Sequence, residues 1–213
     1  MDVILFQERI DLQDCDILII GFFEDERPLR GSSGWVDWRL NGKLSCFLIQ
    51  NRLTGYWKEM TLIPSYGRVP PKMILAVGLG KVREYSYIRL RELSPYLVDT
   101  LRRLQTSNIC FSLPYEENYN VDCGKLAEVI IEGMADSLER YQSPSEEGWI
   151  KDLRLYFAEG EKRFPEILLG VQTAQSILEG RFKIRIFSPS DENPLDQSIE
   201  ALPKAIPLSH PIH

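Results

Sequence analysis

The segment with the clearest chemical potential is Gly78-Leu79-Gly80-Lys81, which follows a strongly apolar run and precedes a predicted helix. Glycines in this position let the backbone approach a phosphate group, and the N-terminus of a helix favours bound anions. The third glycine of a dinucleotide-binding fingerprint is missing, and the sequence has no Walker pattern. The pattern favours a tight strand-to-helix turn, and a loop that contacts a small anionic ligand is the alternative.

A second candidate ligand loop ends the apolar run at residues 16–23. If this run and the run at 73–78 are both strands, Gly21 and Phe22 end one strand and Gly78 ends the other. The ligand-binding interpretation therefore uses both loops. Its candidate residues are Gly21, Phe22, Gly78, Leu79, Gly80 and Lys81.

The residues that usually carry out hydrolysis do not form a recognisable site. Acidic residues occur in like-charged runs such as Glu24-Asp25-Glu26, which are typical of solvated loops and not of the converging carboxylates of a two-metal site. The two histidines, His210 and His213, lie in the last four residues, where nothing fixes their geometry. A Ser-His or Cys-His nucleophile is thus excluded in its usual form. We expect no catalytic residues, no metal and no cofactor.

Four aromatic residues gather around a predicted short helix and the loop after it: Trp35, Trp38, Tyr56 and Trp57. Aromatic side chains at such spacing often pack at the edge of a core, and they are also favoured as anchors of interfaces. A Gly/Ser loop comes directly before Trp35. Core packing and a role in an interface or ligand wall both remain open.

The elements that would position these residues follow from the apolar pattern, which changes repeatedly between strand-like and helix-like periods. Near-continuous apolar runs predict strands covered on both faces, and apolar spacings of three and four predict helices. Strands are expected at residues 3–6, 16–23, 59–64, 73–78, 108–113, 153–157 and 184–186, the last at an edge. Helices are expected at 90–104, 122–141 and 164–178. This alternation predicts a mixed, mostly parallel sheet between helices.

Two helix boundaries carry specific expectations. In the helix at 90–104, Ser94-Pro95 is either a new N-cap or a kink. In the helix at 122–141, Asp122 is the expected N-cap, and a polar stripe is expected opposite the apolar one. The stripe comprises Lys125, Glu128, Glu132, Asp136 and Glu139. The segment Ser143-Pro144-Ser145 is interpreted as a turn-rich break, and the proline-marked residues 188–213 as an arm or tail.

Composition narrows the class of protein. The chain has 213 residues and a net charge of −6, which argues against a nucleic-acid-binding protein because such a protein needs a basic face. No apolar run is long enough to span a membrane, and the acidic N-terminus does not resemble a signal peptide. We therefore expect a cytoplasmic protein. The four cysteines are scattered and are expected to be reduced and mostly buried.

Three segments together resemble a known family. They are residues 16–31, with Asp16-Ile17-Leu18-Ile19-Ile20-Gly21 at the start; residues 36–45, Val36-Asp37-Trp38-Arg39-Leu40-Asn41-Gly42-Lys43-Leu44-Ser45; and residues 73–81, which end in Gly-Leu-Gly-Lys. Their order and spacing are similar to those of the N-terminal domain of the leucyl aminopeptidases, the M17 zinc/manganese peptidases. The resemblance covers about residues 1–180, and stand-alone bacterial proteins with this domain are also similar.

The resemblance implies a three-layer α/β/α, macro-domain-like fold, which we assign to residues 1–187. In the full-length peptidases the metals and the catalytic lysine and arginine belong to a larger C-terminal domain. Its signature, Asn-Thr-Asp-Ala-Glu-Gly-Arg, is absent from this sequence, and residues 188–213 are too few for a second domain.

The leading hypothesis is a non-catalytic interaction or regulatory module that binds a protein partner or self-associates. A small-ligand (nucleotide or ADP-ribose-like) binding domain is the alternative. The specific ADP-ribose interpretation is weakened because Gly21-Phe22-Phe23 stands where macro domains carry an asparagine-rich loop. Residual metallo-aminopeptidase activity is not expected.

Overall fold

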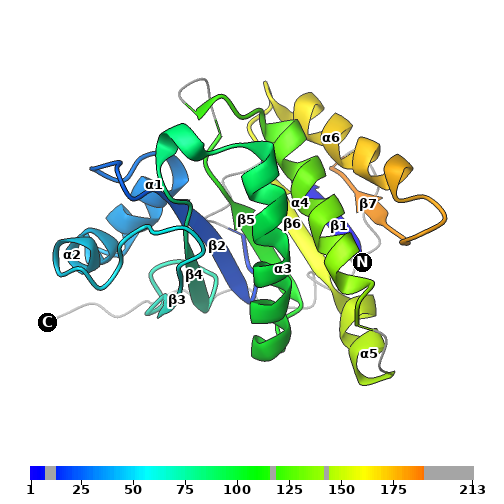
Figure 1. Cartoon of the computed structure of the whole chain (residues 1–213), viewed down its shortest axis with the longest axis horizontal. Coiled ribbons are helices and arrows are strands. Elements are labelled where there is room, and N and C mark those ends of the chain that lie inside the picture. Colours follow the sequence, from blue (N-terminus) through cyan, green and yellow to red (C-terminus); the bar gives the residue numbers. More distant parts are fainter. Residues whose placement is uncertain (8–12, 116–118, 142–143, 190–213) are drawn as a thin grey trace, which may run out of the picture.

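The computed structural model describes residues 1–7, 13–115, 119–141 and 144–189 (Figure 1). At its centre is a seven-stranded sheet with the order β3-β4-β2-β5-β6-β1-β7. All neighbouring strands are parallel except β3, which is antiparallel to β4. The strands are β1 (Asp2–Phe6), β2 (Ile17–Phe22), β3 (Met60–Pro64), β4 (Met73–Gly78), β5 (Asn108–Ser112), β6 (Arg154–Ala158) and β7 (Arg185–Phe187).

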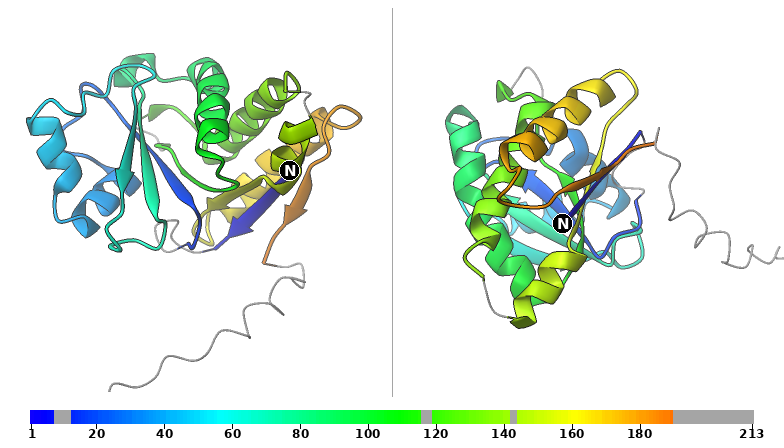
Figure 2. Two further views of the ribbon diagram at one scale, coloured as in Figure 1. Left: turned by 90° about the horizontal axis from the view of Figure 1, so that it is seen from below. Right: turned by 90° about the vertical axis from the view of Figure 1, so that its right-hand side faces the viewer.

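Helices cover both faces of the sheet (Figures 1 and 2). They are α1 (Gly31–Arg39), α2 (Lys43–Ile49), α3 (Tyr87–Leu104), α4 (Cys123–Leu138), α5 (Pro144–Asp152) and α6 (Phe164–Ile177), with a short 3-10 helix at Val82–Glu84. Because side chains alternate across a strand, Ile17 and Ile19 of β2 pack in the large core cluster with α3, α4 and α6. Leu18 and Ile20 pack in a smaller cluster with α1 and α2. The predicted three-layer α/β/α fold is confirmed.

Both edges of the sheet are short or interrupted. The edge strand β7 has three residues and pairs with β1, where both arms of the Arg185 guanidinium donate to the Asp2 carboxylate at 2.7 and 2.8 Å. At the opposite edge, β3 ends at Pro64. The predicted edge position of the last strand is confirmed. Residues 190–213, which include most of the predicted tail, lie outside the described part of the chain, so the boundary at 187 stays a prediction.

Helix α3 is continuous through Pro95. Its N-cap is Ser86, whose hydroxyl accepts a hydrogen bond from the backbone N–H of Arg89. Ser94 therefore does not start a new helix, and its hydroxyl instead donates back to the Leu90 carbonyl. The predicted N-cap of α4 is confirmed, because the Asp122 carboxylate accepts from the N–H of Lys125 at 2.8 Å.

Two acids of the polar stripe on α4 are not exposed to solvent. Glu128 and Glu132 are buried, because α3 and α6 flank α4 on both sides. Each acid keeps a basic partner: Lys125 contacts Glu128, and Arg91 of α3 contacts Glu132 at 2.7 Å. The apolar stripe of α4 could be identified from its periodicity. The packing of α3 against the other side of α4, which brings Arg91 to the buried charge of Glu132, could not.

Two helices were missed by the sequence analysis. The segment interpreted as a turn-rich break begins α5, since proline is well tolerated at the start of a helix. The second, α2, is capped from the preceding helix, because the Asp37 carboxylate of α1 accepts the backbone N–H groups of Leu44 and Ser45. The role of Asp37 in the segment at residues 36–45 is therefore structural, because its carboxylate joins α1 to α2.

Two further predictions concern the burial of the cysteines and the character of the helices. Cys15, Cys110 and Cys123 are buried and Cys46 is exposed, and no disulfide joins any of them. Among the described residues, no helix has both the length and the apolar character that crossing a membrane requires.

Candidate ligand-binding site

A cavity of about 780 Å³ opens at the carboxyl ends of the parallel strands. Residues that follow β1, β2, β5 and β6 line it, together with the starts of α1 and α4. The chain leaves β2 towards β3 and β4, and leaves the neighbouring β5 towards β6 on the other side. Connections that diverge in this way leave a crevice outside the strand ends, which is where open α/β sheets bind ligands.

One wall of the cavity is the start of α1, at Gly31, Ser32 and Ser33. The Ser33 hydroxyl donates to the Gly21 carbonyl at 2.6 Å and the Ser32 hydroxyl to the Ser112 carbonyl at 3.4 Å, so the helix start is fixed to the ends of β2 and β5. The N-cap residue Arg30 provides no side-chain cap. The start of α1 thus lines the cavity without a side-chain cap, and an uncapped helix N-terminus favours an anion.

The charge near this helix start is partly balanced. Arg30 and Glu26 both line the cavity, and the Arg30 Nε lies 3.9 Å from a Glu26 carboxylate oxygen. The Tyr119 hydroxyl donates to the same carboxylate at 2.9 Å. Glu26 is thus held by two partners, one basic and one a hydroxyl donor.

Aromatic side chains form much of the remaining wall. Phe111 at the end of β5 and Phe157 of β6 stack with ring centroids 5.2 Å apart, and both line the cavity. Tyr119 stacks on Phe23 at 5.1 Å, which fixes the tyrosine where it borders the cavity. Flat apolar surfaces of this kind suit an aromatic ring of a ligand.

An acid lies at the other end of the cavity. Glu159 directly follows β6 and is only 6% exposed. Its Oε1 atom is one of the few buried side-chain polar atoms of the described residues that have no hydrogen-bond partner. Burial raises the pKa of the Glu159 carboxyl from 4.5 to about 7, against the opposing effects of a hydrogen bond from the Gly160 backbone and of the Arg163 charge. Near neutral pH this acid is therefore close to half protonated.

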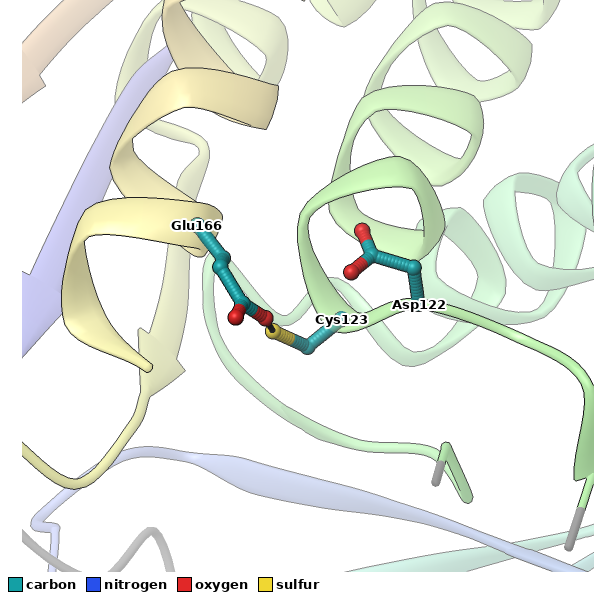
Figure 3. A group of neighbouring side chains, drawn as sticks. All are labelled: Asp122, Cys123 and Glu166. Atoms are coloured by element: carbon teal, nitrogen blue, oxygen red, sulfur yellow. Dashed lines mark hydrogen bonds between the residues drawn. The ribbon is translucent and has the colours of Figure 1, made fainter. Parts of the chain in front are cut away.

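Beside the cavity, Asp122, Cys123 and Glu166 bring three potential metal ligands within 4.8 Å of one another (Figure 3). The Cys123 thiol donates to Glu166 of α6 at 3.4 Å, and Asp122 already caps α4. Burial raises the pKa of the Cys123 thiol to about 12, and the hydrogen bond to Glu166 acts in the same direction. Helix capping and the contact between α4 and α6 account for this group without a metal.

The structure separates the two predicted ligand loops. Gly21 and Phe22 line the cavity, whereas residues 78–81 do not. A Cβ atom on Gly78 would lie 2.1 Å from the Tyr56 carbonyl, and the Gly80 N–H donates to the Gly55 carbonyl at 2.9 Å. Close packing of the turn against the loop at 54–59 thus explains its glycines, and a ligand contact by Gly78, Leu79, Gly80 or Lys81 stays a prediction.

The four aromatic residues also do not form one cluster. Trp35 and Trp38 of α1 are 53% and 72% exposed, with ring centroids 6.4 Å apart in an edge-to-face arrangement. Tyr56 is exposed as well, whereas Trp57 packs partly against the large core under the Arg89 guanidinium. Of the two interpretations, core packing therefore applies to Trp57. Trp35 borders the cavity, and an interface role for the exposed residues stays a prediction.

Glu159, Arg30 and the serines at the start of α1 were not among the residues predicted from the sequence. A signal for Glu159 was available, because an acid follows directly after an alternating strand, at the edge where parallel strands place functional groups. Ser32 and Ser33 belong to the Gly/Ser segment before Trp35, and a hydroxyl pair there is suited to fixing the start of a helix.

Solved structures define the class of fold. The macro domain of ganglioside induced differentiation associated protein 2 has a TM-score of 0.61 and 12% identity, over 85% of this chain and 86% of that one. A Trypanosoma brucei macrodomain solved in complex with ADP-ribose has a TM-score of 0.60 and 15% identity, over 78% and 67%. A tomato leucine aminopeptidase mutant has a TM-score of 0.56 and 18% identity, over 85% of this chain but 37% of that one. The fold is therefore macrodomain-like.

Sequence comparison then identifies the family. The model of the cytosol aminopeptidase family, N-terminal domain, matches residues 19–144, and the chain belongs to this family. A probable cytosol aminopeptidase of Sulfurihydrogenibium sp. (strain YO3AOP1) is 23% identical over 158 residues, which are 73% of this chain and 31% of the relative. One from Cyanothece sp. (strain PCC 7425) is 27% identical over 135 residues, 62% and 27%. The chain thus spans less than a third of the length of these relatives.

Proposed function

We propose that this domain binds a small phosphorylated ligand of the nucleotide or ADP-ribose type in the cavity, without catalysing its conversion. The observation that carries the proposal is the cavity itself, about 780 Å³ in volume, at the diverging ends of β2 and β5. Its volume is within the usual range of ligand sites, roughly 300–1,000 Å³. The macrodomain of similar fold that was solved with ADP-ribose supports this class of ligand.

The walls suggest how such a ligand would lie. A phosphate group would be placed at the start of α1, where the backbone N–H groups of Ser32 and Ser33 follow an N-cap without a side-chain cap. A base or sugar would extend along Phe111 and Phe157 towards Glu159. The asparagine-rich loop expected for ADP-ribose is replaced by Gly21-Phe22-Phe23, so the proposal does not depend on side-chain amides.

A non-catalytic role is supported by the chemistry of the cavity wall. Its sulfur group, Cys123, is a protonated thiol at neutral pH because its pKa is raised to about 12, and both histidines of the sequence lie outside the described residues. The described cavity wall therefore holds no activated thiol and no imidazole nucleophile. The relatives are named as cytosol aminopeptidases, which supports a cytoplasmic location for the proposed ligand-binding domain.

Isothermal titration calorimetry with ADP-ribose and ADP tests the proposal. We expect saturable binding of at least one of them with a 1:1 stoichiometry. Gly160 lines the cavity, and a Cβ there meets no atom within 4 Å, so Gly160→Trp should fold and obstruct the cavity, with at least tenfold weaker binding. The matched control is Gly148→Trp, at an open position of α5. Absence of binding to the wild-type protein, or equal binding by Gly160→Trp, would contradict the proposal.

The exposed indoles favour a second candidate function, self-association through α1. Trp35 and Trp38 present a continuous aromatic surface, and tryptophan is enriched among residues that anchor interfaces. In sedimentation velocity, we expect the wild-type protein to associate as its concentration rises and Trp38→Ser to remain monomeric. Ile88→Ser, at an equally exposed position of α3, is the control. A wild-type protein that is monomeric at every concentration rules out this candidate.

A further inference from the structure

The buried carboxyl of Glu159 is incompletely satisfied by the protein. One hydrogen bond comes from the Gly160 backbone, while Oε1 is buried and has no partner among the described residues. Buried polar atoms in native proteins are nearly always paired, so an unpaired one requires an explanation. The charged groups near it, Arg163 and Glu166 at the start of α6, act on its titration in opposite directions and do not hydrogen-bond Oε1.

The fold alone does not require an acid at this position. The backbone N–H of Glu159 donates to the Phe6 carbonyl at 3.0 Å, and this contact between β6 and β1 would be the same for any side chain. The first turn of α6 already contains an acid, Glu166. A side chain of similar size without a charge would fill the same space at lower desolvation cost.

The position of Glu159 in the cavity points to a ligand. Glu159 directly follows β6, and both Glu159 and Phe157 of β6 line the cavity. The start of α1 is fixed to β2 and β5, and β6 is the second strand from β2. The anion-favouring helix start and the acid therefore lie at the ends of neighbouring strands, in the wall of one cavity.

We infer that Glu159 accepts a hydrogen bond from an N–H or O–H group of the ligand in this cavity and thereby selects which ligands bind. The inference rests on the proposed function. It adds that the ligand carries, apart from its phosphate group, a hydrogen-bond donor and not a second anion. In a phosphorylated nucleoside this donor is an amino group of the base or a hydroxyl group of the sugar.

Calorimetric binding of ADP-ribose and ADP to two variants tests the inference. Glu159→Met keeps the volume but cannot accept a hydrogen bond, and we expect binding to weaken about tenfold or more. Glu159→Gln keeps an amide oxygen and should stay within about threefold of the wild-type protein. Glu161→Met, in the same loop but exposed, is the control and should bind normally. Circular dichroism of each variant verifies folding.

Two ligand analogues then identify the donor. IDP lacks the amino group of the base and 2′-deoxy-ADP lacks one sugar hydroxyl. The analogue that lacks the contacted donor should bind the wild-type protein more weakly than ADP, and this difference should vanish in Glu159→Met.

If the wild-type protein binds ADP-ribose or ADP and Glu159→Met binds it equally well, the role of Glu159 is refuted while the proposed function stands. If the wild-type protein binds neither, both fail. Loss of binding in Glu159→Met and Glu159→Gln alike, in folded protein, assigns Glu159 a structural role and also refutes the inference.

Discussion

Replacing Gly170 by alanine is expected to lower the free energy of unfolding by about 2–3 kcal/mol. Gly170 lies where α6 crosses α4, and a Cβ atom there would be 2.0 Å from the Gly124 carbonyl oxygen. The clash is with backbone, which cannot move aside as a flexible side chain could. The two helices are equally close when seen from α4, since a Cβ on Gly124 would lie 2.2 Å from the Glu166 carbonyl oxygen of α6. The helices would have to separate, and Leu126 and Ile167 of the cavity wall would move with them.

Urea denaturation of Gly170→Ala and Gly148→Ala provides a matched comparison. Gly148 lies within α5, and a Cβ there meets nothing within 4 Å. Because alanine favours the helix over glycine by about 1 kcal/mol, Gly148→Ala should stabilise the protein, so the same substitution has opposite signs at the two sites. A Gly170→Ala variant as stable as the wild-type protein would show that α4 and α6 do not approach as closely as described.

Lowering the pH from 8 to 5.5 is expected to increase the contribution of Glu159 to stability. The pKa of its carboxyl is about 7 in the folded protein, against an ordinary value of 4.5. Between these values the folded state binds more protons than the unfolded state, so stability falls as the pH rises from 4.5 to 7 and is then constant. A shift of this size corresponds to about 3 kcal/mol at most. Much of this change lies between pH 5.5 and 7.

The comparison with Glu159→Gln isolates this effect. Unfolding free energies measured in urea at pH 5.5, 6.5, 7.5 and 8 should converge for the two proteins at the lowest pH, and the variant should be the more stable one at pH 8. Asp136 does not interfere. Burial acts to raise the pKa of Asp136, but hydrogen bonds from Arg91 and Arg181 outweigh it and lower the pKa below 3.8, so its contribution is lost only in stronger acid. Identical pH profiles for the two proteins would contradict the assignment.

The sheet could be predicted from the sequence because its strands are buried on both faces. The uninterrupted run Ile17–Ile20 has this character, and the structure divides its side chains between two cores. The burial of Glu128 and Glu132 could not be predicted in the same way. An acid in an amphipathic helix has the same pattern whether it faces water or an arginine of another helix, such as Arg91, and only the tertiary arrangement distinguishes the two.

The candidate site was predictable only in part for a related reason. Both Gly21 and Gly78 lie at the ends of parallel strands. However, β2 has β5 as its neighbour, with β6 next in the sheet, whereas β4 lies between β2 and β3. The crevice therefore forms around Gly21, while the turn after Gly78 is filled by the loop at 54–59. Strand order is a property of the whole chain and cannot be obtained from either loop. The missing partner of Glu159 depends in addition on side-chain packing, which no local pattern encodes.

The short and interrupted edges of the sheet have a consequence for how the protein behaves at high concentration. Unpaired backbone groups on an edge strand can recruit a strand from another molecule and so begin aggregation. Here β7 offers only three residues and carries the charged Arg185, while Pro64 ends β3. Neither edge is a good template for adding strands. Any assembly of this domain should therefore use side-chain surfaces, such as the indoles of α1, and not an extended intermolecular sheet.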